Sequence, residues 1–487
     1  MMNSKQKNGE YIKYEDDGTI VAIDWYTKGN HDCSLSVEDG EHIYQHTNGS
    51  VWQKYNIVDG KVDGEWILNH ASGVSSLYRE FKMGLKVGTW TGWHDDGTEW
   101  MVENYDDDKK NGPYFRWRYG RVPECEGQYK DDKKTGHWNH YYESGVKEFD
   151  GRYKNGKRIG VWNRYHDSSG QIFSKSNYKN GLLEGKYTEI NELGTPSIKG
   201  QYVDGKKHGK WISLSDDERK EVETNYKNGK LHGKTTFYNK SEKISKEIYY
   251  ENDEQIKIMG YHEDGGKIFN IIECSNNKKH GKYTEFSDDG RVVCKGNYVD
   301  GKKHGEWVFL RDDGGVHRAV NYHKDRLDGD FLKWHPNKKL WQGFKYKNGF
   351  KHGVASTFHV NGNKCTSEKW VDGTKNGTFK SWHDNGNKKQ ESEYVSGSLQ
   401  GKQKNWYICG KIENEINFDN GQLDGEFIEH YSNGLKRSFG KMKHDKMQGE
   451  WTFWYHNGNK ECTVICKDGE LIEGKVWHDN GELKGQS

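Results

Sequence analysis

Glycine recurs in this sequence at a near-constant interval of 24 residues. After Gly185 the interval repeats at Gly209 and Gly233, lapses at Lys257, and continues from Gly281 to Gly449. A fixed period indicates a repeat architecture in which each unit contacts only its neighbours. We therefore expect about twenty units and no separate catalytic domain. The glycines of the first unbroken series are Gly64, Gly88, Gly112, Gly136 and Gly160.

Composition favours a thin fold built from aromatic rings. Hydrophobic residues make up only 31% of the 487 residues, yet the chain contains 19 Trp, 30 Tyr and 17 Phe. Disordered chains are poor in aromatic residues, so low hydrophobicity does not indicate disorder here. A net charge of +1 gives no electrostatic drive toward nucleic acid, and we expect no nucleic-acid partner.

Each unit contains two short aromatic runs separated by turn sequences. In the unit that begins at Gly281 the turns are Asp288-Asp289-Gly290 and Asp300-Gly301. Asp-Gly and Asn-Gly between short runs are strong hairpin signals because such turns need positive φ. We expect an all-β fold, an elongated single antiparallel sheet formed by a meander of β-hairpin repeats and twisted or curved. The alternative is a β-solenoid with one unit per coil, whose interior would need more Val, Ile and Leu.

A four-residue second turn predicts the register between consecutive units. With the recurrent glycine as position 1, the tyrosine at position 18 would face the next recurrent glycine, as Tyr298 faces Gly305. The glycine at position 16 would face the tryptophan at position 3 of the next unit, as Gly296 faces Trp307. Each ring would then cover a facing glycine. A second aromatic column, at position 6, is expected on the other face of the sheet.

The strings Asp204-Gly205-Lys206-Lys207-His208-Gly209 and Asp300-Gly301-Lys302-Lys303-His304-Gly305 resemble MORN repeats. The two-turn unit is most similar to the MORN repeat variant of bacterial toxin–antitoxin antitoxin components. We divide the chain into a divergent N-terminal repeat or cap, 1–39, and a continuous MORN-like array, 40–487. The resemblance implies a binding or scaffolding role, with chemistry confined to attached domains in those members that are enzymes.

Recurrent ionisable residues are interpreted as structural. Equivalent histidines such as His46 and His70 would lie ~9.5 Å apart, too far to share one zinc ion. We expect these histidines to donate to backbone carbonyls, and we expect no metal site. Paired acids such as Asp95-Asp96, Asp288-Asp289 and Asp312-Asp313 recur at the same turn of different repeats, which a unique active site would not do. We therefore expect no catalytic residue, no cofactor site and no enzyme activity.

The leading hypothesis is a non-enzymatic repeat scaffold for protein–protein interaction, an antitoxin or immunity protein that neutralises a partner toxin. The alternative is a lipid- or membrane-associated scaffold that uses the lysine-rich turn edge, and a third hypothesis is glycan binding through exposed rings. The oligomeric state is left open. The segment Met1–Glu10 lacks a signal-peptide core and the eight cysteines are scattered, so a cytoplasmic location is expected.

Three tryptophans from well-formed units, Trp138, Trp162 and Trp211, are the candidate partner-binding residues. The competing interpretation is that these rings only cover their glycines. Asn139, Asn163 and Ser213 are expected to lie beside the rings on the surface. Changes at these positions would separate the two interpretations.

Overall fold

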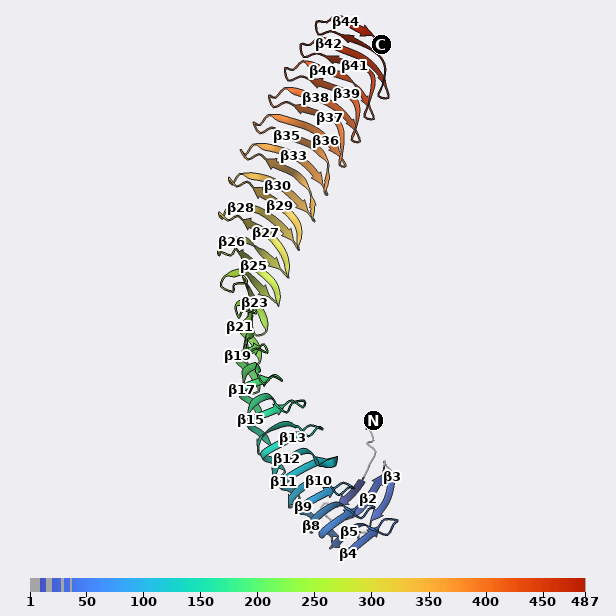
Figure 1. Ribbon diagram of the computed structural model, residues 1–487, viewed down its shortest axis with the longest axis vertical. Helices are drawn as coiled ribbons and strands as arrows, with labels where there is room; N and C mark the ends of the chain where they lie inside the picture. Colours follow the sequence, from blue (N-terminus) through green and yellow to red (C-terminus); the bar gives the residue numbers. More distant parts are fainter. Residues whose placement is uncertain (1–8, 15–19, 28–29, 36, 487) are drawn as a thin grey trace. The chain divides into compact units, whose positions relative to one another are not determined.

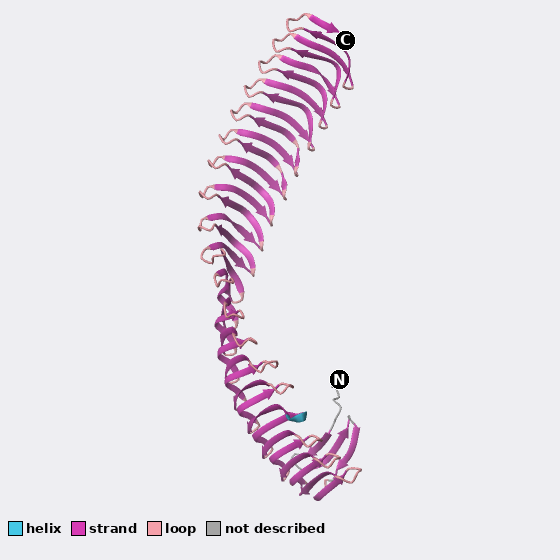
Figure 2. Cartoon of the chain, in the orientation of Figure 1, coloured by secondary structure: helices cyan, strands magenta, loops and turns pink. Residues whose placement is uncertain are grey.

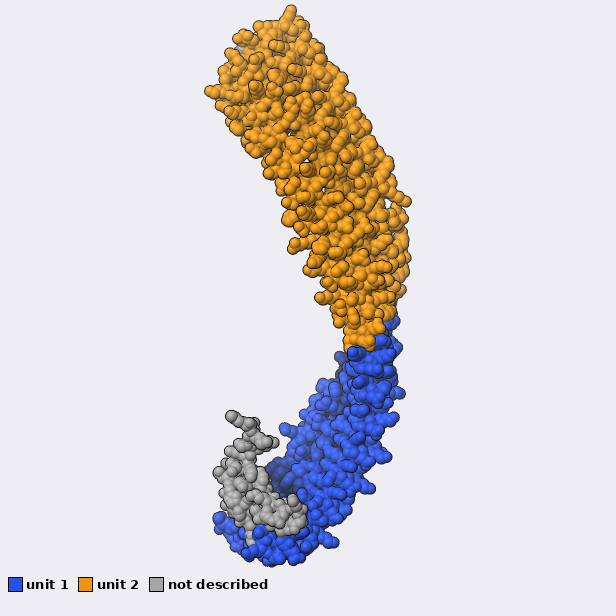
Figure 3. All heavy atoms as spheres, turned by 180° about the vertical axis from the view of Figure 1, so that it is seen from behind, with its two compact units in different colours: residues 1–242 blue, residues 243–487 orange. Residues whose placement is uncertain are grey.

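The computed structural model describes residues 9–14, 20–27, 30–35 and 37–486, with side chains from residue 37 onward. Within this part of the chain the regular structure is β-strand, apart from the 3-10 turn η1 (Tyr119–Arg121) (Figure 2). The chain divides into two compact units, residues 1–242 and 243–487 (Figure 3). Each unit is described by itself below.

Unit 1 contains twenty-one of the described strands (Figure 1). They are β1 (Gly9–Tyr14), β2 (Ile20–Thr27), β3 (Asn30–Leu35), β4 (Gly40–Gln45), β5 (Val51–Val58), β6 (Lys61–Val62), β7 (Gly64–Asn69), β8 (Ser75–Lys82), β9 (Leu85–Trp93), β10 (Glu99–Asp106), β11 (Lys109–Arg118), β12 (Val122–Lys130), β13 (Lys133–Tyr141), β14 (Lys147–Lys154), β15 (Lys157–Tyr165), β16 (Ile172–Lys179), β17 (Leu182–Ile190), β18 (Pro196–Val203), β19 (Lys206–Leu214), β20 (Lys220–Lys227) and β21 (Lys230–Tyr238).

Unit 2 contains the remaining described strands. They are β22 (Ile244–Glu251), β23 (Glu254–Tyr261), β24 (Ile268–Ser275), β25 (Lys278–Phe286), β26 (Val292–Val299), β27 (Lys302–Leu310), β28 (Val316–His323), β29 (Arg326–Trp334), β30 (Leu340–Lys347), β31 (Phe350–Lys351), β32 (Gly353–Phe358), β33 (Lys364–Val371), β34 (Thr374–Lys375), β35 (Gly377–Trp382), β36 (Lys388–Val395), β37 (Ser398–Trp406), β38 (Ile412–Asp419), β39 (Gln422–His430), β40 (Lys436–Lys443), β41 (Lys446–Trp454), β42 (Lys460–Lys467), β43 (Glu470–Trp477) and β44 (Leu483–Gln486).

The pairing confirms the expected meander of antiparallel hairpins. Strands β1–β3 form a small sheet, and β4–β44 belong to one further antiparallel sheet. In the described residues, β4 pairs only with β5 and β44 only with β43, so this sheet is open at both ends. Each repeat contributes one hairpin, and the next repeat continues the same sheet.

The two turns of a repeat have different lengths. In the repeat that begins at Gly136, the first turn is closed by hydrogen bonds from Tyr142 N to Val146 O (2.8 Å) and from Gly145 N to Tyr142 O (3.0 Å). The second turn contains only Asn155 and Gly156, whose φ angles are 51° and 75°. Positive φ at both central residues is the conformation of a type I′ hairpin, whose twist matches that of the strands. The expected four-residue second turn is therefore wrong.

The shorter turn changes the register that we predicted from the sequence. Tyr298 pairs with Gly281 of its own repeat on one side and with Lys303 on the other, not with Gly305. The two residues gained by the short turn are absorbed in a bulge, in which residues 305–307 lie opposite Gly296. Gly305 lies in this bulge at φ 69°, so the recurrent glycine supplies a left-handed backbone.

The second half of the register prediction is confirmed as a ring contact. A Cβ atom added to Gly296 would overlap the indole of Trp307, which covers this glycine across the bulge. The backbone of Gly296 pairs with Tyr283 on its other side.

The sheet presents two different faces. On the aromatic face, defined by the side chains at positions 3, 5, 14, 16 and 18, Trp138, His140 and Phe149 stack in sequence with ring centroids 6.1 and 4.4 Å apart. On the opposite face, the hydroxyl of Tyr141 donates to Glu126 over 2.7 Å. Tyr141 occupies position 6, so the prediction that this column lies on the other face is confirmed.

Candidate functional site

The three candidate tryptophans of unit 1 share one arrangement, which we call the Trp–Gly junction. In each, the indole covers the glycine at position 16 of the preceding repeat so closely that an added Cβ would overlap the ring. The same arrangement recurs in unit 2. The pairs are Trp138 over Gly127, Trp162 over Gly151, Trp211 over Gly200, Trp307 over Gly296 and Trp451 over Gly440.

Each Trp–Gly junction is closed around its indole. Two tyrosines lie edge-on to Trp138, with ring centroids 5.1 Å away for Tyr129 and 6.1 Å for Tyr153. The ammonium of Lys134 lies 3.9 Å from the centroid of the indole, a cation–π contact. Lys207 is 4.3 Å from Trp211, and Arg158 is 4.3 Å from Trp162.

These contacts bury the rings. The exposed fractions of Trp138, Trp162 and Trp211 are 0, 3 and 5%. A partner would therefore meet the side chains that surround the indoles rather than the indoles themselves. Their placement matches the interpretation in which the rings cover glycines.

The surface positions named from the sequence lie on two different faces. Asn139 and Asn163 follow tryptophans directly in their strands, so they point to the opposite face. There, Asn139 donates to Glu126 over 2.6 Å and Asn163 donates to Asp150 over 3.1 Å. Ser213 is two residues from Trp211 and shares its face. The expectation that all three residues lie beside the rings is wrong for the two asparagines.

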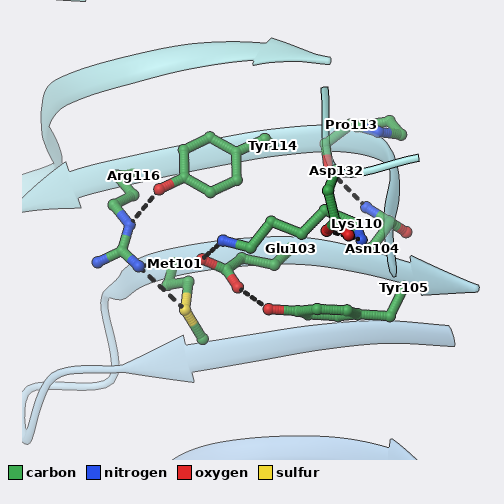
Figure 4. A network of polar contacts seen from close by, with 9 residues as sticks. All are labelled: Met101, Glu103, Asn104, Tyr105, Lys110, Pro113, Tyr114, Arg116 and Asp132. Carbon is green, nitrogen blue, oxygen red and sulfur yellow. Dashed lines mark hydrogen bonds and ion pairs between the residues drawn. The ribbon is translucent and has the colours of Figure 1, made fainter. Parts of the chain in front are cut away.

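In unit 1, one junction that has tyrosine in place of tryptophan is filled by charged side chains (Figure 4). Position 16 is Glu103, with 4% exposure, and position 3 of the next repeat is Tyr114. The carboxylate of Glu103 lies 2.9 Å from Lys110 and 3.0 Å from Arg116, and it accepts a hydrogen bond from Tyr105 over 2.6 Å. Arg116 also donates to the hydroxyl of Tyr114 over 2.6 Å.

The charges of this junction balance each other. Burial raises the pKa of Glu103, but hydrogen bonds from Tyr105, Lys110 and Arg116 outweigh burial and hold the pKa below its ordinary value. The carboxylate is therefore ionised and paired with two cations. The side chains of the junction thus stabilise one another, and we assign it a structural role.

A second tyrosine junction of unit 1 is not filled. This repeat has 25 residues, and Ser176 is equivalent to position 16 of the others; position 3 of the next repeat is Tyr187. Leu183 stands where Lys134, Arg158 and Lys207 contact the three candidate tryptophans. A hollow of about 400 Å³ lies on the aromatic face at this junction, and we call it the Tyr187 hollow. It is lined by Glu148, Phe149, Arg158, Trp162, Asn163, Arg164, Ser174, Ser176, Tyr178, Leu183, Tyr187 and Tyr202.

The Tyr187 hollow combines aromatic walls with polar groups. Tyr187 donates its hydroxyl proton to Glu189 over 2.6 Å, and burial together with this hydrogen bond raises the pKa of Tyr187 well above its ordinary value. Ser174 is buried at 8% exposure. Arg158 donates to the hydroxyl of Tyr178 over 3.2 Å. The hollow can therefore receive a flat, largely apolar group that carries a polar substituent.

Sequence reasoning missed this hollow. It selected the residues that fit the repeat best. The hollow arises where Ser176, Leu183 and Tyr187 replace the glycine, the Arg or Lys, and the tryptophan of the two neighbouring junctions. A comparison of the repeats column by column would have marked this junction.

Several histidines of the first turns contact carbonyls, as the sequence predicts, whereas Nε2 of His94 has no hydrogen-bond partner in the described residues. His70 Nε2 lies 2.9 Å from the carbonyl oxygen of Trp93, and His359 Nε2 lies 3.0 Å from that of Trp382. Tyrosines at the same position do likewise, as Tyr142 donates to the carbonyl of Tyr165 over 2.9 Å. These contacts join the turns of successive repeats into a ladder.

Comparison with known families gives one match. Residues 375–396 match the family described as MORN repeat variant. This match supports a MORN repeat protein. It covers one repeat of unit 2, from the end of a second turn through strand β36. A comparison with curated proteins gave no match.

Solved structures are only distantly similar. A crystal structure of TcdB2-TccC3-Cdc42 has a TM-score of 0.14 at 9% identity, and the match covers 98% of this chain and 27% of that one. A Photorhabdus luminescens Tc holotoxin pore has a TM-score of 0.13 at 9% identity, covering 97% and 27%. A eukaryotic initiation factor has a TM-score of 0.14 at 8% identity, covering 93% and 96%. This chain thus spans about a quarter of the toxin-complex chains, and such low TM-scores carry no functional information.

One further observation concerns membranes. In the residues that the structure describes, no helix is both long and apolar enough to cross a bilayer.

Proposed function

We propose that this protein is a non-enzymatic repeat scaffold that binds a protein partner on the aromatic face of unit 1. The observation that carries the proposal is the Tyr187 hollow, an open position between two closed Trp–Gly junctions. Repeat proteins commonly bind partners along such extended surfaces, and pockets that accept an aromatic anchor are typical centres of protein interfaces. The MORN repeat variant match is consistent with a scaffolding role.

The ionisable side chains of the first turns support the non-enzymatic part of the proposal. Asp96 accepts hydrogen bonds from the backbone and the hydroxyl of Thr98, and these bonds lower its pKa. Asp289 is held in the same way by Arg291 and Ser287. Such carboxylates are hydrogen-bonded anions that brace turns, and the pattern is the same in different repeats.

The test uses the full chain with an affinity tag, expressed in its native host. We expect a protein partner to be recovered in stoichiometric amount, with amide hydrogen exchange slowed in β15–β18 when it binds. A purification that yields no stoichiometric partner would contradict the proposal, as would protection that spares β15–β18. Anionic vesicles provide the comparison for the lipid alternative, and we expect no co-sedimentation at physiological salt.

We further propose that the partner is a toxin which this chain neutralises, in keeping with the bacterial proteins that its repeat resembles. Co-expression with the product of the adjacent gene should then relieve growth inhibition caused by that product alone. Persistent inhibition would remove the antitoxin role and leave the scaffold role unaffected.

A further inference from the structure

The Tyr187 hollow occupies a place where the neighbouring junctions hold an indole. In the preceding junction Trp162 contacts Tyr153 at a centroid distance of 5.0 Å, and in the following one Trp211 contacts Tyr202 at 5.1 Å. Tyr187 contacts Tyr202 and Trp211 at 5.5 and 5.6 Å. Within the described residues it makes no ring contact with Tyr178, the tyrosine on its other side. The row of ring contacts, which are edge-on or tilted, is therefore interrupted between Tyr178 and Tyr187.

The other unit 1 tyrosine junction shows that such an interruption can be filled from within the chain. At Tyr114, Glu103 and Lys110 occupy the space that an indole would fill. At Tyr187, the equivalent residues are Ser176 and Leu183, which are too short to reach across. The open hollow at Tyr187 thus differs from the two flanking Trp–Gly junctions and from the charged junction at Tyr114.

The lining of the hollow suits an indole. Its volume of about 400 Å³ falls in the range of small-molecule sites. Aromatic walls favour a flat ring in an offset or edge-on arrangement. Within the described residues, the hydroxyl of Ser176 has no hydrogen-bond partner, so it can accept the indole N–H. Arg158 at the rim is already directed toward the face of Trp162, 4.3 Å away.

We propose that the Tyr187 hollow receives a tryptophan side chain of the protein partner, which completes the interrupted row of rings. The inference rests on the proposed function, because it names the chemistry by which the scaffold recognises its partner. The indole contributes what the repeat lacks at this junction, a large ring between Tyr178 and Tyr187. Tryptophan is also the residue most enriched among strong interface anchors.

The first experiment measures binding of N-acetyltryptophanamide to the full chain by saturation-transfer NMR. We expect a dissociation constant on the order of 1 mM, as is usual for one buried ring without further contacts. N-acetylleucinamide should bind at least about tenfold more weakly, because it cannot stack. Equal saturation transfer to both probes would overturn the inference.

The matched variant converts the hollow into a Trp–Gly junction. Ser176→Gly combined with Tyr187→Trp reproduces the residues of the flanking junctions, so the chain's own indole should occupy the space. We expect binding of N-acetyltryptophanamide to fall at least about tenfold and the melting temperature to be unchanged or higher. Leu183→Lys is a second variant, because the equivalent Lys134 extends over an indole. Lys199→Gln, on the opposite face, is the control and should bind like the wild type.

The outcomes separate this inference from the proposed function. If the tagged protein recovers its partner equally well with and without the double substitution, the scaffold function stands and the inference is overturned. If the probe binds the wild type and not the double variant, but no protein partner is recovered, the proposed function fails. In that case the hollow is a site for a free indole compound rather than for a protein side chain. Unchanged probe binding in both variants would overturn the inference in either case.

Discussion

At the scale of single residues, position 16 shows two ways in which consecutive repeats join. Where it is glycine, as at Gly151, the three residues opposite it are 160–162 and the indole of Trp162 lies over its backbone. In the second arrangement, Ser176 pairs directly with Tyr187, and the bulge moves by one residue to face Asn177. Glu103 and Tyr114 show the same shifted pairing. Arg79 and Ser392 also face three residues, 88–90 and 401–403, so a side chain at position 16 does not by itself shift the pairing. In the Trp–Gly junctions the missing Cβ leaves the room that the indole occupies.

Gly296→Ala should destabilise the Trp–Gly junction of Trp307, because the new methyl group would overlap the indole. We expect a loss of about 1–3 kcal/mol in the free energy of unfolding, the range for overpacking. Chemical denaturation followed by circular dichroism provides the measurement. Gly485→Ala is the control, since an added Cβ there meets nothing within 4 Å and no positive φ is needed. If Gly296→Ala leaves the free energy of unfolding unchanged, the junction can adopt the shifted pairing without loss of stability.

His140 should make unit 1 sensitive to acid. Burial between Trp138 and Phe149 lowers its pKa to about 4, and the positive charges of Lys134 and Arg158 act in the same direction. The unfolded chain takes up this proton first, near pH 6.5. The contribution of neutral His140 is therefore complete above pH 6.5 and is lost as the pH falls toward 4. Melting temperature against pH should fall less steeply in this interval for His140→Gln than for the wild type, and parallel curves would contradict the assignment.

At the scale of the repeat, two devices at opposite ends of the strands set the geometry. The type I′ turn fixes a two-residue connection, and the bulge after it takes up the residues that the short turn leaves unpaired. Both depend on positive φ, at Asn155 and Gly156 in the turn and at Gly160 (φ 64°) in the bulge. What recurs every 24 residues is therefore first a set of backbone conformations, and the side-chain contacts depend on them.

Gly305 tests the role of the bulge. An added Cβ at this glycine meets nothing within 4 Å, but its φ of 69° disfavours side chains that are branched at Cβ. Gly305→Val should therefore destabilise by about 1–2 kcal/mol through the backbone alone. Gly305→Asn should be milder, because Asn tolerates the left-handed region. Equal losses for the two variants in thermal melts would indicate a steric contact instead.

The sequence predicted the hairpins and missed the register for one physical reason. Asp300-Gly301 marks a turn that needs positive φ, but the same string fits a four-residue loop without a bulge or a two-residue loop with one. Which loop forms depends on whether the next strand contains a bulge. The bulge is determined by how the two strands pair, not by the turn sequence alone. The ring over Gly296 was predicted because glycine opposite tryptophan is a local complementarity. The Tyr187 hollow was not predicted, because it depends on three residues that differ from those at the equivalent positions of neighbouring repeats.

At the scale of the whole molecule, a chain of this kind has no central core whose loss would unfold everything at once. In the described part of unit 1, the largest buried cluster includes Tyr55, Trp66, Phe81 and Trp90, and each of these rings contacts the next one along the sheet. Stability in such arrays is approximately the sum of repeat and nearest-neighbour terms. A destabilising substitution should therefore affect only the repeats next to it.

Hydrogen exchange measures this directly. In Gly296→Ala, we expect amide exchange to accelerate in β25–β28, the strands on either side of the altered junction, because they lose the indole contact that joins them. Strands β11–β14 of unit 1, whose own Trp–Gly junction at Trp138 is intact, should exchange as in the wild type and serve as the internal control. The expectation follows from sub-global opening of neighbouring elements, which samples free energies below that of complete unfolding. A uniform rise of exchange in both units would mean that the array unfolds as a single cooperative body, and the nearest-neighbour description would then be wrong for this protein.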